Sequence, residues 1–418
     1  MEDTGNLVLG LSTTQFVIYY YTALLAGSCA AVYFNYRSVF LLLFSLTLVS
    51  FVLGIVGGVG ALRTVAVCAG LLAIAGMVSF GFKEFLVQLA EGDIGAPFRG
   101  NSTVFVSVLV ALVVLSFLSA SFGWGITEVF AALILIMLIV SPLSPDTAKE
   151  LRTAPMTAAF GLFVVFTYAV MGIAAPWIAP HGEAEVISSA FAPPDENMLL
   201  GADQLGRDMF SRIVYGARNS VGLALAATLA AFILGALAGL LAATKGGWFD
   251  QLMGRIADVI MSIPSLIFSL LMLSIFGPDI QVIIVAVAII YAPRVFRLTR
   301  AVAGNVVVMD YIEAAKLRGE GTWYLIRREI LPNSTAPLVA EFGLEFCFVF
   351  LLVAGLSFLG LGIQPPTADW GSMVRENATL ISFGDITPLI PAAAIALLTV
   401  GVNFVVDWML HRSSGLKE

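Results

Sequence analysis

The chain has 418 residues, of which 59% are hydrophobic and only 12% are charged. Soluble domains average about 45–50% apolar and about 25% charged residues, so this composition indicates an integral membrane protein. The mean hydropathy of +0.98 supports the same conclusion. The net charge of −7 comes without a basic run or face, which argues against nucleic-acid binding.

The cysteines, the histidines and a search for short catalytic motifs give no indication of a metal site or an active site. Cys29, Cys68 and Cys347 lie in apolar stretches and form no CxxC pair, so we interpret them as small buried hydrophobic residues. His181 and His411 are far apart, which argues against a metal site. The sequence contains no GxxxxGK[ST], GxSxG or HExxH motif. We therefore expect a chain that is not an enzyme and that binds no metal or cofactor itself.

Eleven apolar stretches are long enough to cross the ~30 Å hydrocarbon layer as helices. The acidic start MEDTGN lacks the basic region of a secretory signal, so we expect the first stretch to be a retained span. Five predicted spans come early, at 15–34, 38–58, 63–81, 103–121 and 126–142. Six follow, at 156–178, 217–243, 256–277, 280–300, 336–361 and 386–410. The sequence therefore predicts an all-α polytopic membrane protein.

One charged, proline-rich stretch, SPLSPDTAKELRTAP, divides the chain. We predict a five-span extension of unknown role at 1–142, a linker at 143–155 and a six-span module at 156–412. Within the module, a long outer loop is expected at 179–216 and a polar cytoplasmic unit at 304–334.

Lysine and arginine set the orientation, because they collect in cytoplasmic loops. With the N-terminus outside, sixteen of the 21 Lys and Arg residues fall on the cytoplasmic side and five fall outside. Two of the five exceptions, Arg207 and Arg212, lie in the loop 179–216, where acidic residues offset them, and a third, Arg218, follows the loop directly. We therefore place the N-terminus outside and the C-terminus in the cytoplasm.

The polar unit contains the stretch EAAKLRGEGTWYLIRREILPN, which begins at Glu313. Its mixed charges cannot span a membrane, so it lies at the membrane surface or contacts another protein. Ala314 and Ala315 favour a helix, and Gly319 interrupts it. A second helical run is expected up to a stop at Pro332. From the residues alone, an ordinary solvated loop remains the alternative.

Small residues recur every three or four positions along the span 217–243, which makes one narrow face suited to close helix packing. Contact with a neighbouring helix is the first interpretation, and lining of a transport path is the second. The residues of this face are Ala224, Thr228, Ala231, Gly235, Gly239 and Ala242.

Acidic residues inside a span usually face the protein interior, because a charge facing lipid is unfavourable. Glu341 and Glu345 are four residues apart and share a helix face. They either line a pathway or pair with another subunit, and Glu341 alternatively reaches the cytoplasmic interface. Trp370, in the second outer loop, is expected to anchor at the membrane interface.

Three charged residues of the first outer loop, Asp203, Arg207 and Asp208, also permit two interpretations. They either form a salt-bridged structure that holds the loop against the membrane, or they contact a protein that delivers substrate.

Four stretches resemble one known family. The EAA stretch, with Gly319 six residues after Glu313 and ILPN after it, resembles the EAA loop of ABC-importer permeases. The other three resemble signatures of the dipeptide/oligopeptide/nickel permease C-subunit group, in the same order, and the resemblance covers about 150–410. These are LLGADQLGRDMFSRIVYGARNS at 199–220, GGWFDQLMGRIADVIMSIPSL at 246–266 and GLSFLGLGIQPPTADWGSM at 355–373.

The resemblance implies a type I ABC importer permease module in a bacterial-type cytoplasmic (inner) membrane, importing peptides or a related small solute. It implies a second permease subunit, two ATPase subunits that hold ATP and Mg, and an extracytoplasmic solute-binding protein. It also implies that the 304–334 unit is a coupling helix seated on an ATPase. The residues it assigns to this coupling are Glu313, Ala314, Ala315, Gly319, Leu331 and Pro332.

The sequence departs from the group at several positions. Ala202 stands where the group usually has Thr, and Val353 stands where it often has Glu. The five early spans have no counterpart in the usual six-span subunit. Two other functions therefore stay open. One is an ion-coupled secondary transporter or channel without ATPase partners, and the other is a membrane scaffold that uses the extra spans for recruitment.

Overall fold

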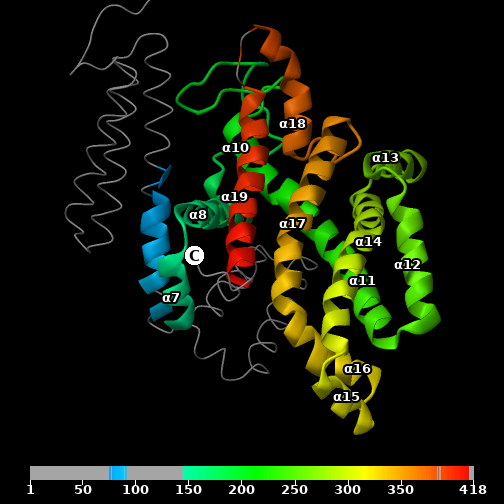
Figure 1. The fold of residues 1–418 in the computed structure, drawn as a ribbon. Helices are drawn as coiled ribbons and strands as arrows, with labels where there is room; N and C mark the ends of the chain where they lie inside the picture. The colour runs from blue at the N-terminus through cyan, green and yellow to red at the C-terminus, as the bar shows by residue number, and fades with distance from the viewer. Residues whose placement is uncertain are drawn as a thin grey trace, which may run out of the picture. The chain divides into compact units, whose positions relative to one another are not determined.

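The computed structural model describes residues 75–76, 78–88, 90–91, 145–383, 385 and 387–413 (Figure 1). In this part of the chain the regular elements are helices, apart from two isolated β-bridges in the outer loop. The predicted all-α membrane architecture is confirmed here. Four of the early spans, at 15–34, 38–58, 103–121 and 126–142, lie outside the described residues, and the span at 63–81 is described only in part.

The chain contacts define two units, Met1–Phe163 and Val164–Glu418. In the first unit, helical residues within 75–91 contact α7 (Pro145–Thr153), a helix in the stretch that the sequence suggested as a linker. Lys83 Nζ donates to the carbonyls of Arg152 and Ala154 at 3.0 and 2.8 Å. A lysine in this position satisfies free carbonyls at the helix C-terminus.

Five helical segments in the described residues are long and apolar enough to cross a membrane, or up to six if a bent pair counts as one span. This agrees with a polytopic permease, and the number of eleven spans stays a prediction. The five are α8 (Met156–Ile173), the run of α10 (Met209–Gly216), η1 (Ala217–Val221) and α11 (Gly222–Lys245), α14 (Ile280–Val307), the run of α16 (Thr322–Tyr324), η2 (Leu325–Ile330) and α17 (Leu331–Phe358), and α19 (Leu389–Ser413).

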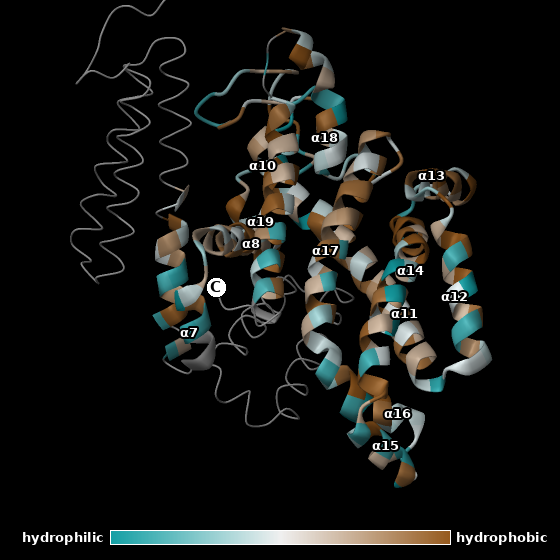
Figure 2. Cartoon of the chain, viewed as in Figure 1, coloured by the Kyte–Doolittle hydropathy of each residue, from teal (hydrophilic) through white to brown (hydrophobic). Residues whose placement is uncertain are grey.

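The bent pair replaces the straight span expected at 256–277. α12 (Gly247–Met261) and α13 (Ser265–Phe276) meet at 84°. Pro264 lies at the break, and a proline disfavours helical geometry in the residue before it. In Figure 2, α13 is largely hydrophobic whereas α12 carries hydrophilic patches. The sequence of α12 includes the charged residues Asp250 and Asp258.

The small-residue face of α11 packs against α14, and the two helices lie side by side in Figure 1. Ala224, Thr228 and Ala231 are at most 1% exposed. A Cβ added to Gly235 would lie 2.4 Å from the carbonyl oxygen of Ala292, and one added to Gly239 would lie 2.8 Å from that of Phe296. The backbones approach too closely for any larger side chain, so the first interpretation of this face, close contact with a neighbouring helix, is confirmed.

The second unit carries polar structure at both ends. α15 (Asp310–Leu317) and α16 project beyond the spans at one end, the lower end in Figure 1. The loop 179–208, α10 and α18 (Trp370–Asn377) lie at the opposite end. These are called the inner end and the outer end below. Two short elements, α9 (Ala175–Ile178) and η3 (Ala378–Phe383), complete the described fold.

Candidate functional site

The inner end is a helix pair, and a hydrophobic cluster fixes it to the neighbouring helices. On α15, Ile312 and Ala315 are fully buried, whereas Glu313 and Ala314 are exposed. The buried pair packs with residues of α11, α14 and η2, namely Leu240, Ala303, Val306, Leu325, Ile326 and Ile330. Three elements that belong to membrane-spanning runs therefore hold α15 in place, while its other face is free.

Gly319 ends α15 in the left-handed conformation, with φ +85°. Its N–H donates to the carbonyl of Lys316 at 2.9 Å, and the N–H of Glu320 donates to that of Ala315 at 3.2 Å. These bonds satisfy carbonyls at the helix C-terminus. An added Cβ would meet nothing within 4 Å, so backbone conformation and not space requires glycine here.

The expectation that Pro332 stops the helix was wrong. Helical backbone continues from Thr322 to Phe358, and Pro332 lies in the first turn of α17. The π-helical turn η2 precedes Pro332, so the regular α-helical hydrogen-bond pattern is already altered where the proline lacks its N–H. The polar side chains that follow Pro332 bond back along the same helix. Asn333 Nδ2 and Ser334 Oγ donate to the carbonyls of Glu329 and Ile330 at 2.6 and 2.8 Å.

Large apolar side chains are exposed on and around this unit. Leu317 is 84% exposed, Val308 79% and Trp323 61%. Leu331 and Pro332, the other two residues assigned to coupling, are also exposed. Apolar groups gathered on a surface in this way mark a contact with another protein or with the membrane.

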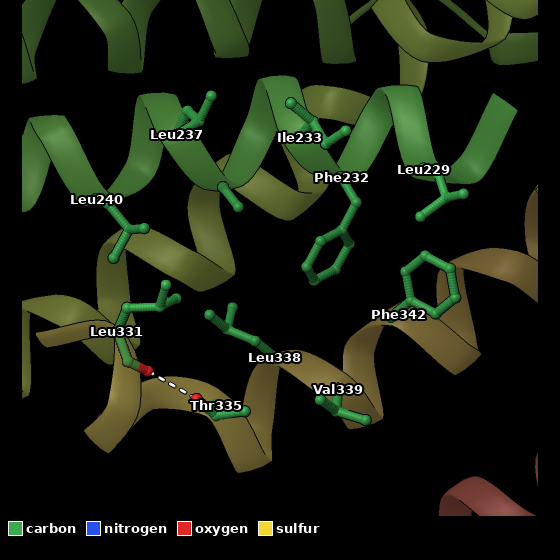
Figure 3. Close-up of a pocket in the computed structure, with 11 residues that line it drawn as sticks. Leu229, Phe232, Ile233, Leu237, Leu240, Leu331, Thr335, Leu338, Val339 and Phe342 are labelled. Carbon is green, nitrogen blue, oxygen red and sulfur yellow. Dashed lines mark hydrogen bonds between the residues drawn. The ribbon is translucent and has the colours of Figure 1, made fainter. Parts of the chain in front are cut away.

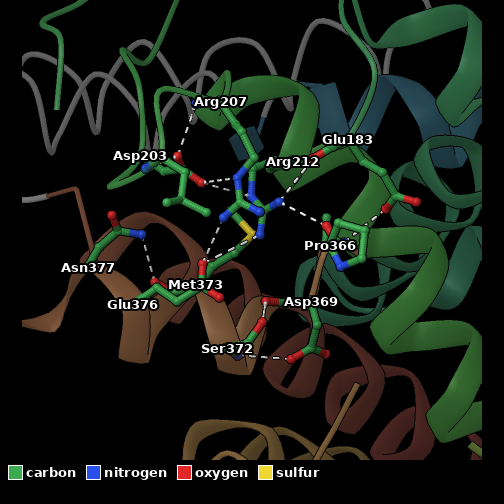
Figure 4. A network of polar contacts seen from close by, with 12 residues as sticks. Glu183, Asp203, Arg207, Arg212, Pro366, Asp369, Ser372, Met373, Glu376 and Asn377 are labelled. Carbon is green, nitrogen blue, oxygen red and sulfur yellow. Dashed lines mark hydrogen bonds and ion pairs between the residues drawn. The ribbon is translucent and has the colours of Figure 1, made fainter. Parts of the chain in front are cut away.

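The outer end is built on a buried network of alternating charges, drawn in Figure 4. Arg207 Nε lies 2.7 Å from Asp203 Oδ2, and its Nη2 lies 3.0 Å from Glu376 Oε2. Arg212 lies 3.3 Å from the same Asp203 oxygen and 3.6 Å from the same Glu376 oxygen. All four side chains are at most 7% exposed. Two cations and two anions thus balance each other away from water.

The network joins segments that are far apart in the sequence. Arg212 Nη1 also donates to the carbonyls of Glu183 and Pro366 at 3.0 and 3.3 Å. Asp208 caps α10, because its carboxylate accepts from the N–H and Oγ–H of Ser211 at 2.9 and 2.6 Å.

The predicted set Asp203, Arg207 and Asp208 is therefore salt-bridged or capping structure that holds the loop. These side chains are at most 2% exposed, and a role in contact with a delivery protein stays a prediction. Sequence reasoning missed Arg212 and Glu376. Arg212 stands in the GRDxxSR signature, whereas nothing local to Glu376 signals its partners.

Trp370 is not an interfacial anchor, so that expectation was wrong. Its side chain is fully buried, and Nε1–H donates to the carbonyl of Ile213 at 2.9 Å. Its ring makes edge-to-face contacts with Tyr168 and Phe350 at 5.4 and 6.2 Å. The indole finds its polar partner inside the protein and therefore has no need of the membrane interface.

Asp369 precedes Trp370 and caps α18, accepting from the N–H of Ser372 at 2.9 Å. It also accepts from Ser220 Oγ at 2.7 Å. Its side chain is fully buried, and this burial raises the pKa of the Asp369 carboxyl, although the serine hydrogen bonds oppose the shift.

An apolar groove of about 550 Å³ lies between α11 and α17 (Figure 3). Thr335 contributes the one hydroxyl among the lining residues, and that hydroxyl donates to the carbonyl of Leu331 at 2.8 Å. Phe232 and Phe342 contact each other across the groove at 5.4 Å. This groove offers hydrocarbon alone and so suits an apolar occupant, not a charged solute.

The two span glutamates lie on α17. Glu345 is 3% exposed, and its Oε2 has no hydrogen-bond partner among the described residues. Glu341 is half-buried one turn away. The guanidinium of Arg294, on the neighbouring α14, is close enough to act electrostatically on both carboxyl groups. Arg294 was assigned to the cytoplasmic side from sequence, whereas it lies within α14, which extends to Val307.

Among the described residues, no group of three or more His, Cys, Asp or Glu side chains is arranged to hold a metal ion. The outer end is a network of buried ion pairs, and the inner end combines an anchored helix with exposed apolar side chains. A bundle of apolar spans with an anchored, exposed helix pair at one end and a rigid polar cap at the other belongs to the class of membrane transport permeases.

Comparisons with known proteins identify the particular family. Residues 231–414 match the family described as binding-protein-dependent transport system inner membrane component. The chain is 35% identical over 263 residues to the dipeptide transport system permease protein DppC of Alkalihalophilus pseudofirmus, covering 63% of this chain and 86% of that protein. It is 34% identical over 258 residues to the probable D,D-dipeptide transport system permease protein DdpC of Escherichia coli, covering 62% and 86%.

A glutathione transport system permease protein, GsiD of Pectobacterium atrosepticum, is 33% identical over 257 residues, covering 60% of this chain and 84% of that protein. The chain therefore belongs to the binding-protein-dependent transport system inner membrane components. It is a multi-pass permease subunit of the cytoplasmic membrane, and these relatives are transport subunits and not enzymes. The predicted membership in the peptide group of ABC-importer permeases is confirmed.

Proposed function

We propose that this chain forms half of the translocation pathway of an ATP-driven importer for peptides or a related small solute. A second permease subunit forms the other half, two ATPase subunits hold ATP and Mg²⁺, and an extracytoplasmic binding protein delivers the solute. The relatives are named as transport permeases for dipeptides, D,D-dipeptides and glutathione, and these names support a peptide-like substrate.

The exposed apolar surface of the inner end is the observation that carries this proposal. Leu317 and Trp323 project from a unit whose inner face is fixed in a hydrophobic cluster. Such a surface is unfavourable in water unless a partner covers it. Glu313 and Ala314 lie on the free face of α15, where a docked ATPase would contact them.

Force on this unit would reach the spans directly. α16, η2 and α17 are continuous, so a displacement at Thr322 is carried by one helical run to Phe358. α15 follows the end of α14 within three residues. Closing of the ATPases would therefore move α14 and α17 together, which supports alternating access.

We place the inner end in the cytoplasm, and with it the C-terminal end of α19. The N-terminus would then lie outside, in keeping with the positive-inside distribution of the 21 Lys and Arg residues. The exposed apolar residues of the outer loop, Leu199 and Leu205, are then candidates for contact with the binding protein, next to the buried Asp203, Arg207 and Asp208.

Energy dependence of uptake tests the proposal. Membrane vesicles that contain the whole transporter and its binding protein would be loaded with ATP, and the uptake of radiolabelled alanyl-alanine would be followed. We expect uptake that requires hydrolysable ATP and that persists when a protonophore collapses the ion gradient.

Uptake that needs the ion gradient and ignores ATP would contradict the proposal and favour an ion-coupled carrier. Removal of residues 1–150 in the same assay tests the role of the extra spans. Unchanged uptake would mean that they are accessory.

A further inference from the structure

Arg294 is an exposed cation halfway along the spanning helix α14. It follows Ile280, the first residue of α14, by fourteen positions, which corresponds to ~21 Å of helix. The hydrocarbon layer is ~30 Å thick. An exposed guanidinium at this depth is strongly unfavourable against lipid, so this face of α14 borders water or protein.

The Arg294 side chain does not reach toward the cytoplasmic interface. Its Cζ lies 5.5 Å from the ring centroid of Tyr291 and 5.1 Å from that of Phe348. Tyr291 lies one turn nearer the outer end on α14, and Phe348 lies one turn nearer the outer end than Glu345 on α17. The charge is therefore held in the span by two aromatic rings, and snorkelling to the inner surface does not explain it.

Glu345 supplies the opposite charge at the same level. It follows Leu331 by fourteen residues on α17, which packs against α14. Its side chain is 3% exposed, yet Oε2 has no hydrogen-bond partner in the described part of the chain. A buried carboxylate oxygen without a partner is unfavourable unless a donor reaches it.

The other two arginines of this stretch behave differently. Arg297 is ion-paired with Asp258 and Arg300 with Asp250, both on α12. Within the described residues, Arg294 has no carboxylate within ion-pair distance, although Glu341 and Glu345 are near enough to act on it. Two of the three arginines thus support the fold, and the deepest one keeps free donors.

We propose that Arg294 and Glu345, with Glu341 one turn away, form a contact site in the translocation pathway for the charged ends of a zwitterionic peptide. The guanidinium would bind the terminal carboxylate, and the glutamates would bind the terminal ammonium. Phe348, 51% exposed beside Arg294, would contact the peptide between them. This inference rests on the proposed function and adds the place where this chain contacts the solute.

Separation of the charges favours this ligand. A site that only neutralises itself would bring guanidinium and carboxylate into contact, as at the outer end, where Arg207 lies 2.7 Å from Asp203. Here both signs are present and both keep unused hydrogen-bonding capacity. A solute with one charge at each end satisfies both, whereas the apolar groove between α11 and α17 offers neither.

Photocrosslinking tests the contact directly. A benzophenone amino acid would replace Phe348 in the whole transporter, and a matched variant would carry it at Phe358, which is 45% exposed on the same helix. With radiolabelled alanyl-alanine, binding protein and ATP, we expect label on the chain at position 348 and not at 358. Absence of label at 348 while uptake continues would overturn the inference, as would crosslinking there to the second permease subunit alone.

Charge-neutral variants separate contact from assembly. Arg294→Gln and Glu345→Gln should each lower uptake about tenfold or more, as the loss of a charged contact predicts, while the assembled complex still hydrolyses ATP when the binding protein docks. Arg294→Lys keeps the charge and should retain more uptake than Arg294→Gln. Arg297→Gln, which loses only an ion pair with α12, should transport normally.

Two results would contradict the inference while leaving the proposed function intact. One is normal uptake in both neutral variants. The other is loss of complex assembly in both, which would make the charges a pairing site for another subunit. Failure of the unaltered transporter to import the dipeptide would instead contradict the proposed function itself.

Discussion

At the outer end, charged side chains are buried and paired with one another, whereas at the inner end large apolar side chains are exposed. Arg212 is 1% exposed and Leu317 is 84% exposed, which reverses the usual distribution of these residue types. The buried charges of the outer end neutralise one another, whereas the exposed apolar side chains of the inner end have no such partner within the described residues. The outer end is therefore a rigid cap for the loop, and the inner end is the surface that we propose docks another protein.

Changing the backbone at the inner end should have the largest effect on function. Gly319→Pro is incompatible with φ +85° and removes the N–H that bonds to the Lys316 carbonyl. The turn after α15 would therefore change, and α15 would no longer be held in its present position. We expect uptake to be abolished while the protein stays inserted. Gly321→Pro is a matched control, because φ at Gly321 is −78° and suits proline. Normal uptake by Gly319→Pro at normal protein levels would refute the coupling role.

Breaking the charge network at the outer end should instead reduce stability. Arg212→Met leaves Asp203 and Glu376 buried with one cation fewer, which should lower the free energy of unfolding by about 3 kcal/mol. The thermal midpoint of the purified complex measures this change. Arg375→Met, on the same helix as Glu376 but with an exposed side chain, is the comparison and should change stability much less. An unchanged midpoint for Arg212→Met would mean that the cap does not depend on the network.

A smaller effect is expected at Trp370. Trp370→Phe keeps most of the buried ring but leaves the Ile213 carbonyl without its donor, which should lower stability by about 1 kcal/mol. Trp177→Phe provides the control, because Trp177 is 59% exposed. Equal effects in the two variants would argue against an internal role for Trp370.

The smallest effect should appear as a pH dependence at Asp369. Because burial raises its folded-state pKa, its contribution to stability is fully present below the unfolded value of about 3.9 and is lost as the pH rises through the folded value. Asp369→Asn keeps an oxygen acceptor for Ser220 but does not titrate.

Relative to the unaltered protein, Asp369→Asn should therefore gain stability as the pH rises from about 4 to about 8. Thermal midpoints of both proteins across this range check the sign. A difference that stays constant, or that falls with rising pH, would contradict the effect of burial on this carboxyl.

Features that depend on residues close together in the sequence could be predicted. The three- and four-residue spacing from Ala224 to Ala242 predicted the close face of α11, and Gly319 predicted the end of α15. In both cases the cause lies within a few residues of chain: a small side chain permits close approach, and glycine permits a left-handed turn.

Features that depend on distant contacts could not be predicted. Trp370 looked like an interfacial anchor because its partner, the carbonyl of Ile213, lies 157 residues earlier. Arg207 and Glu376 are 169 residues apart, and the sequence around either residue does not predict that the two pair. Pro332 was expected to break the helix because a preceding π-helical turn has no reliable sequence signal. The predicted span 280–300 already contains Arg294, but its contacts with Tyr291 and Phe348 became clear only from the packing of α14 and α17.

Purification from native membranes in a gentle detergent, followed by mass spectrometry of the associated proteins, tests whether ATPases dock on the inner end. The unaltered chain should carry a second permease subunit and ATPases with it. Leu317→Asp, at the inner end, should lose the ATPases, whereas Leu199→Asp, at the outer end and 69% exposed, should keep them. If the unaltered chain is recovered without ATPases, or if Leu317→Asp retains them fully, the inner end is not the docking surface and the account is contradicted.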